Sequence, residues 1–244
     1  MREAKNQLLE LLSEPSDLDE NVRRELLNTL LASSRPRRMT FEEFLDWADE
    51  DTLAEWVNGE VILSTPASRQ HQELSGFLYK VLSAYVDVHK LGAVLQAPFL
   101  MKLAHSAREP DLLYIAKDNL KRISSAYLDG PADLVIEIIS PESIGRDRGE
   151  KFYEYEQAAI PEYWLIDPKI ERGEFYRLDQ AGKYQLVNPD SQGIYRSNKV
   201  QDFWLRVDWL WQDPPPPVDD VLLEVGGESY AEHLIKRLRE RGFL

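Results

Sequence analysis

The 244-residue sequence contains no cysteine, which excludes disulfide bridges, thiolate zinc sites and cysteine nucleophiles. It also lacks any apolar run that approaches the ~20 residues of a membrane-spanning helix. Its first ten residues, MREAKNQLLE, contain no apolar stretch like that of a secretory signal peptide. Together these absences predict a protein of the reducing cytoplasm.

Positive charge is scarce, because 43 acidic side chains outnumber 29 basic ones and give a formal net charge of -14. A protein that coats nucleic acid needs a basic face to neutralise phosphates, so this composition argues against that class. The deficit is uneven, since residues 56–199 hold 20 acidic and 17 basic side chains. This nearly balanced middle still permits an enzyme that acts on nucleic acid, because a bound divalent ion would neutralise several of its acids.

Hydrophobic periodicity predicts a mixed α/β (α+β) fold. A capping-box pattern at Thr40 and Glu43 predicts a short helix to about residue 49. A hairpin with Asn58-Gly59 as its turn follows, and then a long amphipathic helix over 69–90. Strand-like runs and one further helix complete the pattern: 93–103, 111–116, 133–139, 162–167 and 174–178 as strands, 147–159 as the helix. This order favours a mixed sheet packed by helices on its faces.

Three segments are predicted. Residues 1–38 carry leucines at helical spacing and end in the linker SSRPRR, so they form a helical appendage. Residues 39–213 form the central domain. Residues 214–244 begin with four prolines, a stiff spacer, and end in a helix over about 228–241. Because the leucine stripe of the appendage must be buried, we expect it to dock on the core or on a second subunit, which would make the protein a homodimer.

Two carboxylates stand at positions where an acid needs a partner. Asp111 follows a proline at the head of an apolar strand, and Glu137 lies inside the aliphatic run LVIEII. Burying a lone carboxylate is costly, so each requires a proton, a cation or a metal. If their strands are neighbours, the two side chains converge on a hard-oxygen site suited to Mg²⁺ or Mn²⁺. The alternatives are a strand-start cap for Asp111 and, for Glu137, either an edge-strand glutamate that reaches solvent or a buried pair with an arginine.

Lys151 is the candidate cation beside these acids. The segment SPESIGRDRGEKFYEY leads from the Glu137 strand into the next helix. We assign Asp147 as the N-cap of that helix. Lys151 and Tyr155 then share one face of the helix. An ammonium there would orient a water molecule or stabilise negative charge. The alternative is an ordinary solvated helix lysine.

At these residues a family resemblance becomes plain. The string EPD, the EII that follows 25 residues later, and then SPES, DRGEK and IPEYWLIDP resemble the Uma-two-type family of putative restriction endonucleases. That family belongs to the PD-(D/E)XK nuclease superfamily. The resemblance covers roughly residues 40–210, from EWVNGEVILSTPASRQH to FWLRVDWLW, and leaves both ends of the chain unexplained.

The resemblance implies a role for several residues. Asp111, Glu137 and the backbone carbonyl of Ile138 would hold Mg²⁺ (or Mn²⁺). The lysine of the superfamily pattern is missing, because Ile139 stands there, and Lys151 would replace it. An acid from the preceding helix would complete the site, for which Glu73, with His71 beside it, is the candidate. Glu60 matches a recurrent family acid without an assigned place.

The function implied is metal-dependent endonuclease cleavage of DNA phosphodiester bonds. Three alternatives stay open. The first is a catalytically inert module for DNA binding or protein interaction, because the usual lysine position holds Ile139. The second is a hydrolase of another substrate, which the acidic balance favours. The third is an assembly protein that recruits a partner through its terminal helices.

Overall fold

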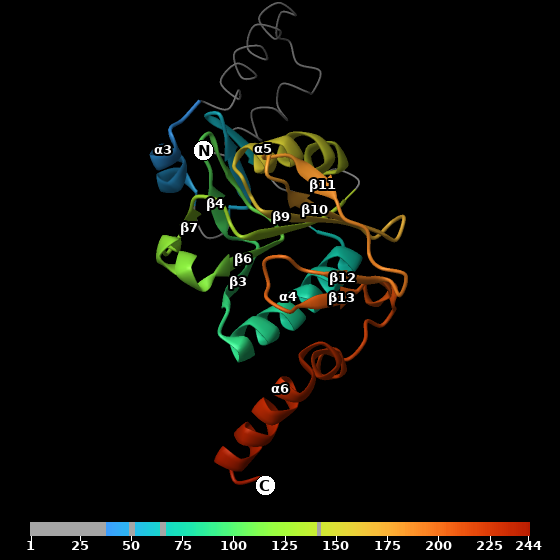
Figure 1. The fold of residues 1–244 in the computed structure, drawn as a ribbon. Helices are drawn as coiled ribbons and strands as arrows, with labels where there is room; N and C mark the ends of the chain where they lie inside the picture. Colours follow the sequence, from blue (N-terminus) through green and yellow to red (C-terminus); the bar gives the residue numbers. More distant parts are fainter. Residues whose placement is uncertain (1–37, 49–51, 64–66, 141–142) are drawn as a thin grey trace, which may run out of the picture.

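The computed structural model describes residues 38–48, 52–63, 67–140 and 143–244. The predicted appendage 1–38 therefore lies, apart from Arg38, outside the described residues. Figure 1 shows a central sheet with helices against it and one long helix, α6, that leaves the body at the bottom of the view. No helix in the described part of the chain is long and apolar enough to cross a membrane.

A six-stranded sheet forms the centre of the molecule, with the strand order β11-β10-β9-β8-β6-β3. Its strands, in that order, are β11 (Tyr184–Leu186), β10 (Arg172–Leu178), β9 (Glu162–Asp167), β8 (Leu134–Ile138), β6 (Leu112–Ala116) and β3 (Gly92–Gln96). Only β8 and β9 run parallel to each other; the other neighbours are antiparallel. Every residue of these two strands is buried, which explains why their sequences lack polar alternation.

Helices cover both faces of this sheet. One face packs against α4 (Arg69–His89), whose apolar side contributes Phe77, Leu78 and Val81 to the larger core. The other face packs against α5 (Lys151–Gln157), where Tyr155 is fully buried. The mixed sheet flanked by helices that the sequence predicts is therefore confirmed.

A second sheet of five short strands lies beside the first, in the order β2-β1-β5-β4-β7. It consists of β1 (Ala54–Val57), β2 (Glu60–Leu63), β4 (Leu100–Lys102), β5 (Ser106–Arg108) and β7 (Tyr127–Asp129), and it packs on α3 (Phe41–Trp47). The hairpin β1–β2 and the capping box of Thr40 and Glu43 are both confirmed. The single strand predicted over 93–103 is wrong. It divides into β3 and β4, which belong to different sheets, around Pro98, which has no amide to donate to a ladder.

The helix predicted over 147–159 starts differently from expectation. A π-helical turn, η2 (Arg146–Glu150), precedes α5, and neither it nor α5 has a side-chain cap. Asp147 is therefore not an N-cap, which corrects the sequence interpretation. Its carboxylate turns inward instead and the residue is 1% exposed.

The C-terminal part adds a two-stranded sheet and the last helix. The strands β12 (Ile194–Arg196) and β13 (Trp204–Arg206) form an antiparallel pair. Two 3-10 turns of the described residues are η1 (Lys117–Arg122), which follows β6, and η3 (Val207–Trp211), which follows β13. Helix α6 spans Val218–Glu240, so it begins ten residues before the predicted 228. Val221, Leu222 and Val225 of its first half join the larger core. The predicted division at residue 213 stays a prediction, although this part of the C-terminal segment packs against the central domain.

Candidate active site

The two predicted carboxylates meet because β6 and β8 are antiparallel neighbours. Leu112 pairs with Ile136, so Asp111, one residue before β6, lies opposite Glu137. Opposite residues of an antiparallel pair project to the same face, here the face that carries α5. Asp111 is fixed there by the amide of Ile138, which donates to its Oδ2 at 2.6 Å.

A small polar cavity of about 110 Å³ opens at this point. Its walls come from β1, the first turn of α4, the ends of β6 and β8, and the π-helical turn with the start of α5. The lining residues are Glu55, His71, Glu109, Asp111, Glu137, Ile138, Ser140, Ser143, Arg146, Asp147 and Lys151. Five of these eleven residues are acidic, so the cavity is built to surround positive charge.

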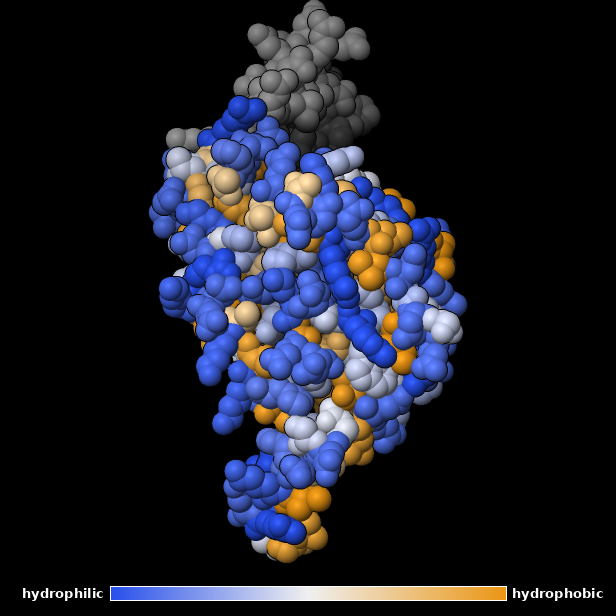
Figure 2. All heavy atoms as spheres, viewed as in Figure 1, coloured by the Kyte–Doolittle hydropathy of each residue, from blue (hydrophilic) through white to orange (hydrophobic). Residues whose placement is uncertain are grey.

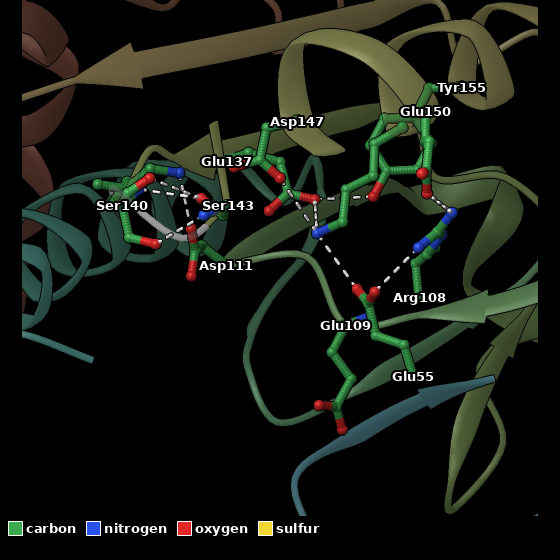
Figure 3. A network of polar contacts seen from close by, with 12 residues as sticks. Glu55, Arg108, Glu109, Asp111, Glu137, Ser140, Ser143, Asp147, Glu150 and Tyr155 are labelled. Atoms are coloured by element: carbon green, nitrogen blue, oxygen red, sulfur yellow. Dashed lines mark hydrogen bonds and ion pairs between the residues drawn. The ribbon is translucent and has the colours of Figure 1, made fainter. Parts of the chain in front are cut away.

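Lys151 supplies the positive charge among the carboxylates of Glu55, Glu137 and Asp147, which are labelled in Figure 3. Its Nζ lies 2.9 Å from Glu137 Oε1, 3.2 Å from Glu55 Oε1 and 3.5 Å from Asp147 Oδ1. Tyr155, one helical turn further, donates its hydroxyl to Glu137 Oε1 at 2.7 Å. The predicted shared face of Lys151 and Tyr155 is thus the face that contacts Glu137.

A buried arginine supports this group from behind. Arg108 on β5 contacts Glu55 Oε2 at 3.0 Å and Glu154 Oε2 at 2.7 Å. Glu55 therefore bridges two cations, Arg108 and Lys151. Because Glu55 and Arg108 come from the second sheet and Lys151 and Glu154 from the α5 segment, the network joins that sheet to α5 at the cavity.

Comparison with known proteins decides the family. The family model of Uma2, putative restriction endonuclease, matches residues 41–208. The chain belongs to the Uma2 family. Its fold is shared with a crystal structure described as a putative nuclease belonging to DUF820 from Anabaena variabilis ATCC 29413, with a TM-score of 0.60 and 17% identity over 71% of this chain and 97% of that one. Comparison with curated proteins gives no match.

Protonation in the Uma2 cavity follows from burial and from Lys151. Burial raises the pKa of Glu137 to about 8, although Lys151 opposes the shift. Burial also raises the pKa of Asp147, and it raises that of Glu109 to about 7. Burial acts the same way on Glu55, but Lys151 and Arg108 outweigh it and lower the pKa of that carboxyl. The site thus holds an ionised Glu55 beside Glu137 and Glu109, whose raised pKa values of about 8 and about 7 lie near neutral pH.

His71 lines the cavity beside Asp111 and contacts its carboxylate. Ser68 caps α4 by accepting the backbone amide of His71, and this places the imidazole Nε2 3.2 Å from Asp111 Oδ2. Burial lowers the pKa of His71, but the hydrogen bond and charge of Asp111 outweigh burial and raise it. His71, named in the sequence only as the neighbour of Glu73, is the residue of this helix turn that reaches the cavity.

The donor set fits a hard divalent cation. Within the described residues, Asp111 Oδ1 and Glu137 Oε2 take part in no hydrogen bond or ion pair, and the buried Asp147 Oδ1 has the ion pair with Lys151 but no hydrogen bond. No group of three or more acidic or histidine side chains in that part of the chain forms a ready-made metal cage. Two carboxylates with a backbone carbonyl suit Mg²⁺, which keeps several of its water ligands.

Two acids singled out in the sequence lie elsewhere. Glu73 forms an ion pair with Arg69 at 2.7 Å and lines a different cavity, beside Trp209 and Trp211. Glu60 lies on the exposed hairpin, 3.7 Å from Arg38. The structure brings neither of them to the cavity that holds Asp111, Glu137, Ile138 and Lys151.

Sequence reasoning missed Glu55 and Glu109. Glu55 alternates with apolar residues in AEWV and reads as the exposed side of a hairpin, whereas it is 4% exposed. Glu109 precedes the Pro-Asp pair directly, and Figure 3 shows its carboxylate turned away from the network. Only the pairing of β1 with β5 brings them close, through the Glu109 amide that donates to Glu55 Oε1 at 3.2 Å.

Proposed function

We propose that this Uma2 protein is a metal-dependent endonuclease that hydrolyses phosphodiester bonds of DNA with Mg²⁺ or Mn²⁺. The observation that carries the proposal is the meeting of Asp111 and Glu137 across β6 and β8, with the Lys151 ammonium 2.9 Å from Glu137. Family membership supports a nuclease in general. The metal and the choice of DNA belong to the proposal.

Each residue has a defined task in this proposal. Asp111, Glu137 and the Ile138 carbonyl hold the metal ion, which when bound supplies an acidic water and offsets charge on the scissile phosphate. Lys151 places a cation next to that phosphate and stabilises the negative charge that develops on it. Tyr155 orients Glu137 through its hydroxyl, and the Ile138 amide orients Asp111.

His71 and Glu55 act on these groups rather than on DNA. His71 faces Asp111 Oδ2 and so directs the other carboxylate oxygen, Oδ1, into the cavity. Glu55 holds the Lys151 ammonium at 3.2 Å, together with Glu137 at 2.9 Å. Both are positioning residues, because each contacts a residue of the proposed metal and phosphate machinery.

The test separates metal binding from cleavage. Calorimetry with Mn²⁺ should show binding to the parent chain and loss of it in Asp111→Asn and Glu137→Gln. Glu73→Gln is the matched control, since it removes an acid of the same region that lies outside the cavity. Supercoiled plasmid DNA with Mg²⁺ should be nicked by the parent and the control only.

The outcomes distinguish the open alternatives. Unchanged Mn²⁺ binding in both site variants would remove the metal site. Binding without cleavage of any DNA would favour the inert module. Cleavage of RNA or of a small phosphodiester in place of DNA would retain the hydrolase and change its substrate.

A further inference from the structure

The second half of α6 leaves the body of the molecule. Every residue from Ile235 to Glu240 is exposed, whereas Val221, Leu222 and Val225 in the first half are buried. Figure 1 shows this half projecting below the body, and Figure 2 shows apolar side chains gathered on one side of its tip. A helix end without tertiary contacts is marginally stable in water by itself.

The projecting half carries an apolar stripe. Ala231, Leu234, Ile235 and Leu238 recur at spacings of three and four residues and so share one face. Ile235 is 41% exposed and Leu238 is 42% exposed. Leu234 touches the core only at its edge. In the described part of the chain, Ile235 and Leu238 are therefore the exposed part of the stripe, whereas Leu234 packs against the edge of the core.

The helix ends in a defined cap. Gly242 adopts a positive φ of 75°, and the amides of Gly242 and Phe243 donate to the carbonyls of Arg239 and Leu238, both at 3.0 Å. This is the Schellman arrangement, in which a glycine closes a helix. The sequence thus specifies a helix up to the cap, with its apolar stripe intact.

Charge is segregated along α6. Its acids lie mostly in the first part, Asp219 to Glu232, and its lysine and arginines lie in the last part, Lys236 to Arg239, with Arg241 directly after the helix. Within the described residues Glu228, Glu232 and Arg239 form no ion pair. These three are spaced by four and seven residues, so they lie on one flank of the apolar stripe.

We propose that this stripe pairs with the same stripe of a second copy of the chain, antiparallel and around a two-fold axis. An axis between residues 234 and 235 sets Leu234 against Ile235 and Leu238 against Ala231. Arg239 then falls midway between Glu228 and Glu232 of the second copy, about 3 Å along the axis from each. The pairing buries the stripe and closes on itself, because the contact is isologous.

Charge and dipole select the antiparallel direction. An antiparallel pair brings the acidic part of each helix beside the basic part of the other and opposes the two helix dipoles. A parallel pair would set acidic part beside acidic part and bring the two bodies together at one end. A single helix pair buries less than the ~1,200 Å² of stable interfaces, so the association depends on concentration.

The absence of cysteine permits a direct test of the register. Single cysteines placed on the stripe form disulfides only where two Cα atoms approach within about 7 Å. Ile235→Cys, beside the axis, should give a cross-linked dimer under mild oxidation. Leu238→Cys alone should stay uncross-linked, and mixing it with Ala231→Cys should link the two chains. Ile170→Cys, on an exposed turn of the body, is the control.

Mass measurements on the full chain complete the test. Sedimentation over about a hundredfold range of concentration should show a monomer that becomes a dimer. Leu238→Asp should abolish the dimer, Arg239→Glu should weaken it about tenfold or more, and Glu228→Arg with Glu232→Arg should restore the Arg239→Glu dimer. A monomer at every concentration, a dimer unaffected by Leu238→Asp, or cross-linking of Leu238→Cys by itself would each overturn the proposal. A monomer whose Leu238→Asp variant melts at a lower temperature would assign the face to a segment of the same chain.

Discussion

At the scale of the residue, Lys151 is a built-in counter-ion for the carboxylates of Glu137, Glu55 and Asp147. It is buried, yet its pKa is raised because Glu137, Glu55 and Asp147 outweigh the cost of desolvation. Removing one partner from a buried charge group leaves the others without compensation. Lys151 is therefore tied to the stability of the site as well as to its proposed chemistry.

Lys151→Ala should lower both stability and activity. Loss of the buried cation should cost about 3–5 kcal/mol, or roughly 10 °C in melting temperature without metal. Loss of a transition-state contact should slow DNA cleavage by a factor of ~100 to ~1000. Calorimetric melting in chelator and plasmid nicking measure the two effects. Lys169→Ala, an exposed lysine on the β9–β10 turn, is the control; equal cleavage by Lys151→Ala and parent would leave Lys151 a structural residue only.

Metal affinity should depend on the proton of Glu137. Its folded-state pKa of about 8 lies above the ordinary 4.5, so this group favours the folded apo protein at low pH, and its contribution is lost as pH rises toward 8. Metal binding requires the proton to leave. Mn²⁺ affinity should therefore rise about tenfold per pH unit below about pH 8 and level off above it. Calorimetry from pH 6 to pH 9 checks this, and a flat profile would contradict it.

The site residues that sequence patterns predict are those with a local signal. Asp111 after proline and Glu137 in an aliphatic run are conspicuous, and the spacing of Lys151 and Tyr155 fixes their common face. Glu55 carries no such signal, because its burial depends on Arg108, 53 residues away. Glu73 misleads because the first turn of α4 presents His71 to the cavity, two positions earlier.

At the scale of the element, one side chain joins the small sheet to α5. The Arg108 guanidinium is 2% exposed and reaches Glu55 on β1 as well as Glu154 on α5. Its fork of donors serves both carboxylates at once, and burial keeps the pairs from being screened by solvent.

Arg108→Met should loosen the second sheet from the rest of the molecule. The buried Glu55 would lose one of its two cations and the half-buried Glu154 would lose its ion pair, at a cost of about 3–5 kcal/mol. Arg108→Lys should recover little, since a point charge cannot reach both partners. Compared with the parent, Arg108→Met should speed up hydrogen exchange more in β1 and β5 than in β8 and β9. An equal increase in exchange rate in all four strands would mean that Arg108 stabilises both sheets to the same extent.

Element boundaries were predictable where periodicity is local and failed where tertiary packing decides. The amphipathic period of α4 and the capping box of α3 depend only on residues that are close together in the sequence. The division of 93–103 depends on which sheet each half joins. The early start of α6 depends on the core that receives Val221 and Val225, and Gly227, with a positive φ of 52°, marks where its helical course is broken.

At the scale of the whole molecule, the core continues into the last helix. Val221, Leu222, Val225 and Tyr230 pack with α4 and the C-terminal strands in one cluster. A chain that ends at residue 213 would expose this surface. Such a truncated chain should aggregate or lose its cooperative melting transition, which light scattering and calorimetry would detect. A sharp transition at the parent temperature would show that 214–244 is an independent appendage.

Removal of the first 38 residues should have the opposite outcome. The family match begins at residue 41, and α3 begins there with its own cap from Thr40. The 39–244 chain should remain soluble and melt cooperatively within a few degrees of the parent. Aggregation of this chain would place the leucine-rich segment in the core and move the domain boundary toward the start of the sequence.

The ammonium of Lys151 among three carboxylates has a consequence for the order of events in the life of the protein. In a pocket lined only by acids, the carboxylates would repel one another until a metal ion bound. Folding of that region would then depend on the supply of metal. This pocket brings its neutralising charge on its own chain. The newly made protein can therefore reach its final shape without a metal ion, before the ion of the proposed mechanism binds.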